Sequence, residues 1–317
     1  MYRLREETSG GLKKVILEDP GTGVHLSVVP AFGANVNELV LVKNGKPYSV
    51  LSGNKDAGGF EGKGVFRSAK LSPFPNRLKD GTYTFEGKEY RLELNYPEEH
   101  NACHGFIYNK VFFLEKHTET EDSASVTFAH NYDGSLAGYP FNYKISLDYA
   151  LSASDGFECT TTVKNTGKAS MPVGDGWHPF FTFNKDVAGL ELAFSAEEKI
   201  EVDDRLMPTG KKDHYRIFDT LKKIGNTCFD TCFKLMPGST GCQTTELHDR
   251  ESGVTIRLWQ ETGVGKYNYL QIFIPSERTS IAIEPTTCDI NAFNNHEGII
   301  VLKPGENFRG RYGVKLA

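Results

Sequence analysis

The sequence predicts an all-β fold, in the form of one large antiparallel β-sandwich. Short segments in which apolar and polar residues alternate recur along the whole chain, and Gly and Pro residues separate them. No segment has the 3.6-residue apolar periodicity of a convincing amphipathic helix. Many short alternating strands divided by turn residues are typical of sandwiches and barrels. We therefore expect fewer than about a tenth of the residues in helices, where globular proteins usually have about a third.

The strand pattern is clearest at Tyr143–Leu151, where every second residue is large and apolar. Similar patterns predict strands along the rest of the chain, in this order: Val15–Glu18, Val24–Val29, Val36–Val42, Thr82–Phe85, Tyr90–Tyr96, Val111–Glu115, Ser125–Asn131, Phe157–Asn165, Leu190–Phe194, Phe229–Phe233, Val254–Trp259, Leu270–Ile274, Ser280–Glu284, Ile299–Leu302 and Gly310–Leu316. The regions around Glu197–Lys199 and Lys212–Arg216 are expected to be loops with a helical turn or two.

Turn residues divide these strands. Asn44-Gly45 and Glu86-Gly87-Lys88 predict tight hairpins, because Asn and Gly tolerate positive φ. Pro285 is expected to stop strand pairing after Glu284, since Pro has no N–H to donate. Gly53–Gly64 is polar and rich in Gly, which predicts a loop, and its glycines lack the spacing of a phosphate-binding loop.

The chain shows no internal boundary. Its 317 residues contain no linker, low-complexity run, charge block or fixed-period repeat. The length is sufficient for one large β domain or for two ordinary ones. We expect a single domain that spans residues 1–317.

Composition and charge argue against several classes of partner. The net charge is −5 and no basic run occurs, which argues against nucleic acid and against an anionic membrane. The N-terminus lacks an apolar signal segment and no later run is long enough to span a bilayer, so a cytoplasmic protein is expected. The sequence leaves open whether the protein is a monomer or a homodimer.

The six cysteines are scattered among hydrophobic residues, which favours reduced thiols. Cys228 and Cys232 lie four residues apart, but no matching Cys or His pair is near them in the sequence. A zinc site is therefore disfavoured, and both are interpreted as core thiols. Neither a metal nor a cofactor is expected.

The segment Ser72–Tyr108 mounts Arg77 and His104 at the two ends of a short hairpin unit. An Arg and a neutral His that lie close together suit an oxygen-rich ligand, because Arg donates in a fixed fork and His both donates and accepts. The alternative is a surface Arg and a structural loop His, and these two residues alone do not exclude it.

Three further residues carry chemistry of interest. His178 lies between Trp177 and Pro179, in stiff aromatic surroundings where its pKa is tunable across neutrality. Asp230 interrupts an apolar strand, and Glu284 ends another at the rim of a sheet, where a general base is reasonable. The loop 289–294 follows and is placed to line the same mouth. Taken singly, each of these residues also has a purely structural explanation.

The order of these motifs resembles the aldose 1-epimerase (galactose mutarotase) family over roughly Val24 to Leu316. The resemblance is carried by the following segments: Asn76-Arg77-Leu78, Asp80-Gly81-Thr82-Tyr83, Glu86–Leu92, His104-Gly105, His178-Pro179-Phe180-Phe181, Phe229-Asp230 with Phe233, Glu284 after a strand, and Leu302-Lys303-Pro304-Gly305-Glu306. Each motif is short, but all of them stand in the family's order.

The resemblance implies a galactose-mutarotase-like supersandwich and an enzyme that interconverts the α and β anomers of a free aldohexose. It implies that Glu284 is the base that deprotonates the anomeric hydroxyl and that His178 is the acid that protonates the ring oxygen. It also implies that Arg77, His104, Asp230 and Asn76 bind the sugar. Ring opening needs a base at one oxygen and an acid at its neighbour, which this set supplies without a metal or cofactor.

Two departures put the sugar in question more than the reaction. The His segment reads Trp177-His178-Pro179-Phe180, whereas the form associated with galactose mutarotases is Asn-His-Ala-Tyr-Phe. The Phe74-Pro75-Asn76 context also differs from that of the family. An epimerase of hexose 6-phosphates is one alternative, and it would need cations such as Arg67, Lys70 or Lys79 at the rim. A non-catalytic sugar-binding or sensing protein is the other, although retention of both an acid and a base argues against it.

Overall fold

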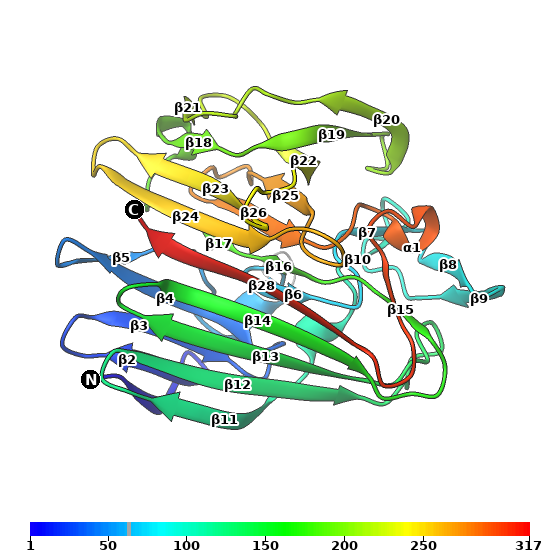
Figure 1. Cartoon of the computed structure of the whole chain (residues 1–317), viewed down its shortest axis with the longest axis horizontal. Helices are drawn as coiled ribbons and strands as arrows, with labels where there is room; N and C mark the ends of the chain where they lie inside the picture. The colour runs from blue at the N-terminus through cyan, green and yellow to red at the C-terminus, as the bar shows by residue number, and fades with distance from the viewer. Residues whose placement is uncertain (62–64) are drawn as a thin grey trace.

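The computed structural model describes residues 1–61 and 65–317 (Figure 1). Strands make up 53% of it and helices 4%, which confirms the prediction of an all-β sandwich with few helices. Within the described ranges, no helix has the length and apolar character that a bilayer crossing requires.

Three antiparallel sheets form the body of the molecule. The first has five strands in the order β1 (Arg3–Ser9), β2 (Leu12–Asp19), β3 (Val24–Val29), β4 (Asn35–Lys43) and β5 (Lys46–Ser49). The second has nine, in the order β11 (Phe113–Glu119), β12 (Ser123–Tyr132), β13 (Tyr143–Ser152), β14 (Gly156–Asn165), β28 (Asn307–Leu316), β24 (Val254–Glu261), β23 (Cys242–Asp249), β18 (Glu191–Ala193) and β21 (Lys222–Lys223). The third has the order β20 (Pro208–His214), β19 (Ala196–Val202), β22 (Asp230–Leu235), β25 (Tyr269–Phe273), β26 (Ile281–Thr286), β16 (Gly176–His178) and β6 (Ala69–Leu71), and β17 (Phe180–Phe181) also pairs with β26.

Shorter elements surround these sheets. Three two-stranded ladders pair β7 (Arg77–Lys79) with β10 (Asn101–Cys103), β8 (Thr82–Phe85) with β9 (Lys88–Arg91), and β15 (Met171–Val173) with β27 (Ile300–Leu302). The helices of the described residues are one α-helical turn, α1 (Ala292–Asn295), and the 3₁₀ turns η1 (Ala57–Phe60), η3 (Ile107–Asn109) and η4 (Val187–Gly189). Figure 1 shows β8, β9 and α1 together at one end of the molecule.

The core lies between the sheets, where the inner strands bury their apolar side chains, whereas every residue of the edge strand β11 is exposed. In β13 the residues at the period-two positions of Tyr143–Leu151 are at most 2% exposed, as the alternation predicts. Strands β2, β3 and β4 contact β12, β13 and β28, so the first sheet packs against the second. Trp177 on β16 stacks on Tyr312 of β28 with ring centroids 4.8 Å apart, which packs the third sheet against the second as well.

The two hairpin predictions are confirmed. Asn44 and Gly45 have φ of 53° and 73°, and Glu86 and Gly87 have φ of 49° and 78°, so both turns use two left-handed residues. The second hairpin is shorter than expected, because its pairing ends at Arg91 opposite Thr82, where β8 begins. The strand predicted at Tyr90–Tyr96 is therefore wrong beyond Arg91.

Several other expectations are wrong for physical reasons. The loops expected around Glu197–Lys199 and Lys212–Arg216 are largely occupied by strands β19 and β20, whose polar residues pair at the exposed edge of the third sheet. Strand pairing does not stop at Pro285, which lies opposite Leu270 inside β26.

The remaining corrections concern a loop and a cysteine. Part of the loop predicted at Gly53–Gly64 is the 3₁₀ turn η1, and its residues 62–64 lie outside the described residues. Cys228 is exposed, so the prediction of two core thiols holds for Cys232 alone.

Candidate active site

The third sheet carries a row of polar side chains on neighbouring strands. Gln271 on β25 pairs directly with Glu284 on β26. Strands β16 and β17 pair with β26 on either side of Glu284, which places His178 across from it. Residues that face each other in an antiparallel ladder point to the same side of the sheet. The register of these strands therefore presents His178, Glu284 and Gln271 on one face.

His178 and Glu284 form a close, buried acid/base pair. Nε2 of His178 lies 3.4 Å from Oε1 of Glu284, and Glu284 is only 1% exposed. Burial raises the pKa of Glu284 well above its usual 4.5, and the nearby charge of Asp230 raises it further. Burial lowers the pKa of His178 to about 3. The two groups therefore share one proton over a wide pH range. Burial favours the uncharged arrangement, in which Glu284 carries this proton and His178 is neutral.

A chain of hydrogen bonds links Asp230 to Asn76 through Gln271. The Gln271 amide donates to Oδ1 of Asp230 at 2.7 Å and accepts from Nδ2 of Asn76 at 3.0 Å. Asn76 also accepts, at Oδ1, from the backbone N–H of Arg77 at 2.9 Å. Both polar atoms of the Asn76 side chain are thus engaged within the protein, and Gln271 fixes the orientation of the Asp230 carboxylate.

Arg77 lies between Asn76 and Asp230. Its guanidinium donates to Oδ1 of Asn76 at 3.3 Å and to Oδ2 of Asp230 at 3.4 Å. The side chain is 13% exposed, and its Nε is buried without a hydrogen-bond partner among residues 1–61 and 65–317. A buried N–H of this kind has donor capacity left for an oxygen-rich ligand.

The tautomer of His104 is set by the backbone. Strand β10 pairs Cys103 with Arg77, which brings His104 next to Asn76. The backbone N–H of Asn76 donates to Nδ1 of His104 at 3.1 Å, and the N–H of His104 donates to the Asn76 carbonyl at 2.8 Å. Since Nδ1 accepts a hydrogen bond, the neutral ring carries its proton on Nε2. Burial lowers the pKa of His104 well below its usual value, so His104 is a neutral Nε2–H donor.

Aromatic rings surround the two histidines. The ring of Phe180 stacks on His178 with centroids 4.9 Å apart and an interplanar angle of 7°. Phe66 lies 4.7 Å from His104, and the two imidazoles meet edge to face at 5.2 Å. Rings packed in this way fix the imidazoles and exclude water from them, which explains the burial behind both lowered pKa values.

The structure therefore brings all six residues selected from the sequence into one linked cluster: Asn76, Arg77, His104, His178, Asp230 and Glu284. Trp177 is not part of this cluster, because it packs between the sheets against Tyr312. In the loop 289–294, the N–H of Asn291 donates to the Arg77 carbonyl at 2.8 Å and Oδ1 of Asn291 accepts from the N–H of Lys79. This loop braces the strand that carries Arg77.

Gln271 is the residue that sequence reasoning missed. It is the one strongly polar side chain in β25, Tyr-Leu-Gln-Ile-Phe, and it is 4% exposed. A buried polar side chain in an apolar strand needs a partner, and this signal was available in the sequence. What the sequence does not show is the register that places Gln271 beside Glu284.

Comparisons with known proteins agree with the geometry. A family model described as aldose 1-epimerase matches residues 14–315. The chain is 25% identical over 311 residues to the maltose epimerase of Levilactobacillus brevis, which covers 96% of this chain and 82% of that protein. It is 28% identical over 187 residues to the galactose mutarotase of Rattus norvegicus, which covers 57% of this chain and 52% of that protein.

A solved structure shares the fold over the whole chain. It is that of a galactose mutarotase-like protein from Clostridium acetobutylicum, with a TM-score of 0.88, 22% identity, and coverage of 100% of this chain and 98% of that one. This likeness confirms the galactose-mutarotase-like supersandwich. With the family model matched across nearly all of its length, the chain belongs to the aldose 1-epimerase family, whose members are isomerases.

Proposed function

We propose that this protein, over residues 1–317 as one domain, is a mutarotase that interconverts the α and β anomers of a free aldohexose. One observation carries the proposal, namely the 3.4 Å separation between Nε2 of His178 and Oε1 of Glu284 inside a cluster rich in hydrogen-bond donors. Two groups at this spacing are able to serve the two oxygens bonded to one anomeric carbon, as concerted ring opening requires.

The proton transfers in this proposal balance. Carboxylate Glu284 takes the proton of the anomeric hydroxyl, the C1–O1 bond becomes a carbonyl, and the bond from C1 to the ring oxygen breaks. Protonated His178 delivers its proton to that ring oxygen. Rotation about the C1–C2 bond followed by the reverse transfers closes the ring as the other anomer.

Burial assists the forward transfers. After ring opening Glu284 is protonated and His178 is neutral, which is the arrangement favoured by the raised pKa of Glu284 and the lowered pKa of His178. The charged pair that starts the step is held by attraction across 3.4 Å and by the hydroxyls of the sugar. The site therefore destabilises the reactive pair of charges relative to the products of the proton transfer.

The other cluster residues orient the sugar in this proposal. Arg77, Nε2–H of His104 and the carboxylate of Asp230 contact the ring hydroxyls, and Gln271 joins them. The expected role of Asn76 as a direct ligand is replaced by a positioning role, since its side chain already bonds Arg77 and Gln271.

The cations near the site favour an uncharged sugar over a hexose phosphate as the substrate, because most of them already have partners within the protein. Arg67 donates to Ser52 and to Glu277, both at 3.0 Å, and lies over the ring of Phe180. Lys70 is buried against Asp175. Two of the three cations that the sequence offered for a phosphate are thus engaged by other groups.

Polarimetry tests the proposal directly. Freshly dissolved α-glucose, α-galactose, maltose and glucose 6-phosphate are each followed to rotational equilibrium with and without the protein. We expect faster relaxation for at least one uncharged sugar. Acceleration of glucose 6-phosphate alone would support the phosphate epimerase instead. Sugar binding measured by calorimetry without any acceleration would identify a non-catalytic binding protein.

A further inference from the structure

A fully buried ion pair lies behind the strand that carries His178. Nζ of Lys70, on β6, donates to Oδ2 of Asp175 at 2.5 Å, and the two side chains are 1% and 0% exposed. The hydroxyl of Tyr267 donates to the same carboxylate oxygen at 2.6 Å. It lies 3.4 Å from the Thr161 hydroxyl on β14. These four residues, Lys70, Asp175, Tyr267 and Thr161, form what we call the buried polar cluster.

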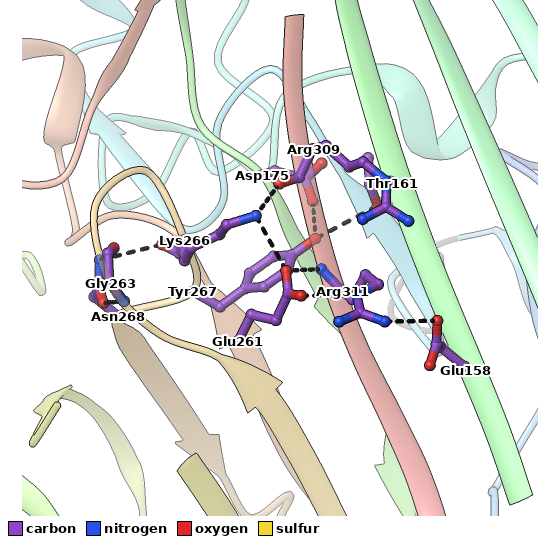
Figure 2. Close-up of polar contacts among 10 residues, drawn as sticks. All are labelled: Glu158, Thr161, Asp175, Glu261, Gly263, Lys266, Tyr267, Asn268, Arg309 and Arg311. Atoms are coloured by element: carbon purple, nitrogen blue, oxygen red, sulfur yellow. Dashed lines mark hydrogen bonds and ion pairs between the residues drawn. The ribbon is translucent and has the colours of Figure 1, made fainter. Parts of the chain in front are cut away.

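The loop that supplies Tyr267 is itself braced, as Figure 2 shows. The N–H of Gly263 donates to Asn268, and the Asn268 amide donates back to the Gly263 carbonyl, at 2.8 and 2.7 Å. Lys266 donates to Glu261 at 3.1 Å and to the carbonyl of Arg309 at 2.6 Å. The Tyr267 hydroxyl is therefore held in place from the second sheet, and the Asp175 carboxylate with it.

Such an ion pair is a poor source of stability. Removing a carboxylate and an ammonium from water costs several kcal/mol for each ion, and apolar replacements are often neutral or stabilising. The best-attested use of a buried polar group is to fix the register of the elements that carry it. The location of the Lys70–Asp175 pair points to the register between β6 and β16.

Strand β16 is short, and its register decides where His178 lies. Asp175 immediately precedes β16, and on β6 Lys70 lies opposite Trp177 while Ala69 lies opposite His178. A shift of one residue would turn His178 away from Glu284 to the other face of the sheet. The Lys70–Asp175 contact joins β6 to the start of β16 diagonally, so that a shifted register would leave two buried charges unpaired.

We propose that Lys70 and Asp175 are positioning residues that hold His178 at its reacting distance from Glu284, with Tyr267 as their anchor on the second sheet. The inference rests on the proposed mutarotase function for its kinetic consequence. Misplacement of a reacting group by about 1 Å costs up to about a hundredfold in rate.

The test is the double variant Lys70→Met/Asp175→Asn, which removes both charges and keeps the side-chain sizes. We expect a thermal midpoint equal to or above that of the parent, with kcat lowered about ten- to hundredfold and KM changed less than about twofold. The alkaline limb of the pH–rate profile is expected to move, because the coupling between His178 and Glu284 changes with their distance. The matched control is Lys14→Met/Glu38→Gln, which removes a partly buried ion pair from the first sheet and is expected to leave kcat unchanged.

A crystal structure of the double variant supplies a readout that does not depend on activity. We expect the separation of Nε2 of His178 and Oε1 of Glu284 to increase from 3.4 Å. A folded double variant with the parental separation, kcat and pH profile would overturn the inference. Should the double variant not fold, Tyr267→Phe is measured in its place. We expect its kcat to fall about two- to fivefold, and a kcat equal to that of the parent would contradict the inference. A parent that accelerates no sugar refutes the proposed function, and the structural readout still decides the positioning role.

Discussion

Replacing Glu284 by Gln removes the proposed general base and keeps the size and polarity of the side chain. Glu284 is almost wholly buried, so bulk water has no access to act in its place. His178 lies 3.4 Å away and, in the proposed mechanism, already acts as the acid. Loss of a general base typically costs a hundred- to ten-thousandfold in rate, equivalent to about 3–5 kcal/mol of barrier. Because neither water nor His178 substitutes, we expect a loss in the upper half of that range.

The same substitution is expected to leave the fold intact. The folded pKa of Glu284 is raised above its usual 4.5, so folded protein binds a proton that the unfolded chain releases. Stability therefore falls as pH rises from about 4.5 through the folded pKa, and Gln removes this fall. We expect the thermal midpoint of Glu284→Gln at pH 7 to equal or exceed that of the parent.

The assay is polarimetry on a freshly dissolved α-aldose at saturating concentration, with the melting curve measured on the same sample. The loss should appear in kcat, since the proton transfer belongs to the transition state. A Glu284→Gln protein that is folded and turns over like the parent would refute the assignment of Glu284 as the base.

Three further outcomes are expected. Asp230→Asn should raise KM about tenfold and change kcat little, because we propose that Asp230, held by Gln271 and Arg77, orients the sugar hydroxyls. Steady-state polarimetry checks this, and an inactive variant with normal sugar binding would contradict it. The pH profile of kcat/KM should show an acid limb near pH 3, where the pair takes up a second proton at His178, and an alkaline limb above pH 4.5, where the pair loses its one proton at Glu284. An acid limb near the usual His pKa of 6.5 would contradict this prediction. Between pH 7 and pH 4, the free energy of unfolding in urea should fall less for His178→Asn than for the parent, because in the parent the unfolded His178 takes up a proton below pH 6.5 while the folded ring does so only near pH 3. Equal falls in the two proteins would contradict this prediction.

The sequence predicts the fold well wherever a strand has one buried face. Tyr143–Leu151 alternates because one side of β13 packs against the core, and the prediction is confirmed there residue by residue. It fails at the edges of the sheets, where this signal is absent. Strands β1 and β20 are mostly polar and gain their order from pairing with β2 and β19. Conversely, Tyr90–Tyr96 alternates although strand β9 ends at Arg91 and Tyr96 forms an isolated bridge with Asn101.

The individual residues of the candidate site were predictable from the sequence, but their spatial arrangement was not. His178 and Glu284 stand out because each is a titratable residue in an apolar strand setting. Their proximity depends on how β16 and β17 pair with β26, and no local pattern encodes this pairing. The contacts of Asn76 and the tautomer of His104 depend likewise on the pairing of β7 with β10. Register is a tertiary property, set by which faces bury together.

The most direct test of the paired acid/base chemistry is a double-mutant cycle on kcat. Polarimetry at saturating α-aldose is carried out on the parent, Glu284→Gln, His178→Asn and the double variant. If the two residues act as one unit on the same sugar, the double variant should turn over within about threefold of the slower single variant. Losses that multiply, so that the double variant falls by the product of the two single effects, would show that Glu284 and His178 act independently and would contradict the mechanism.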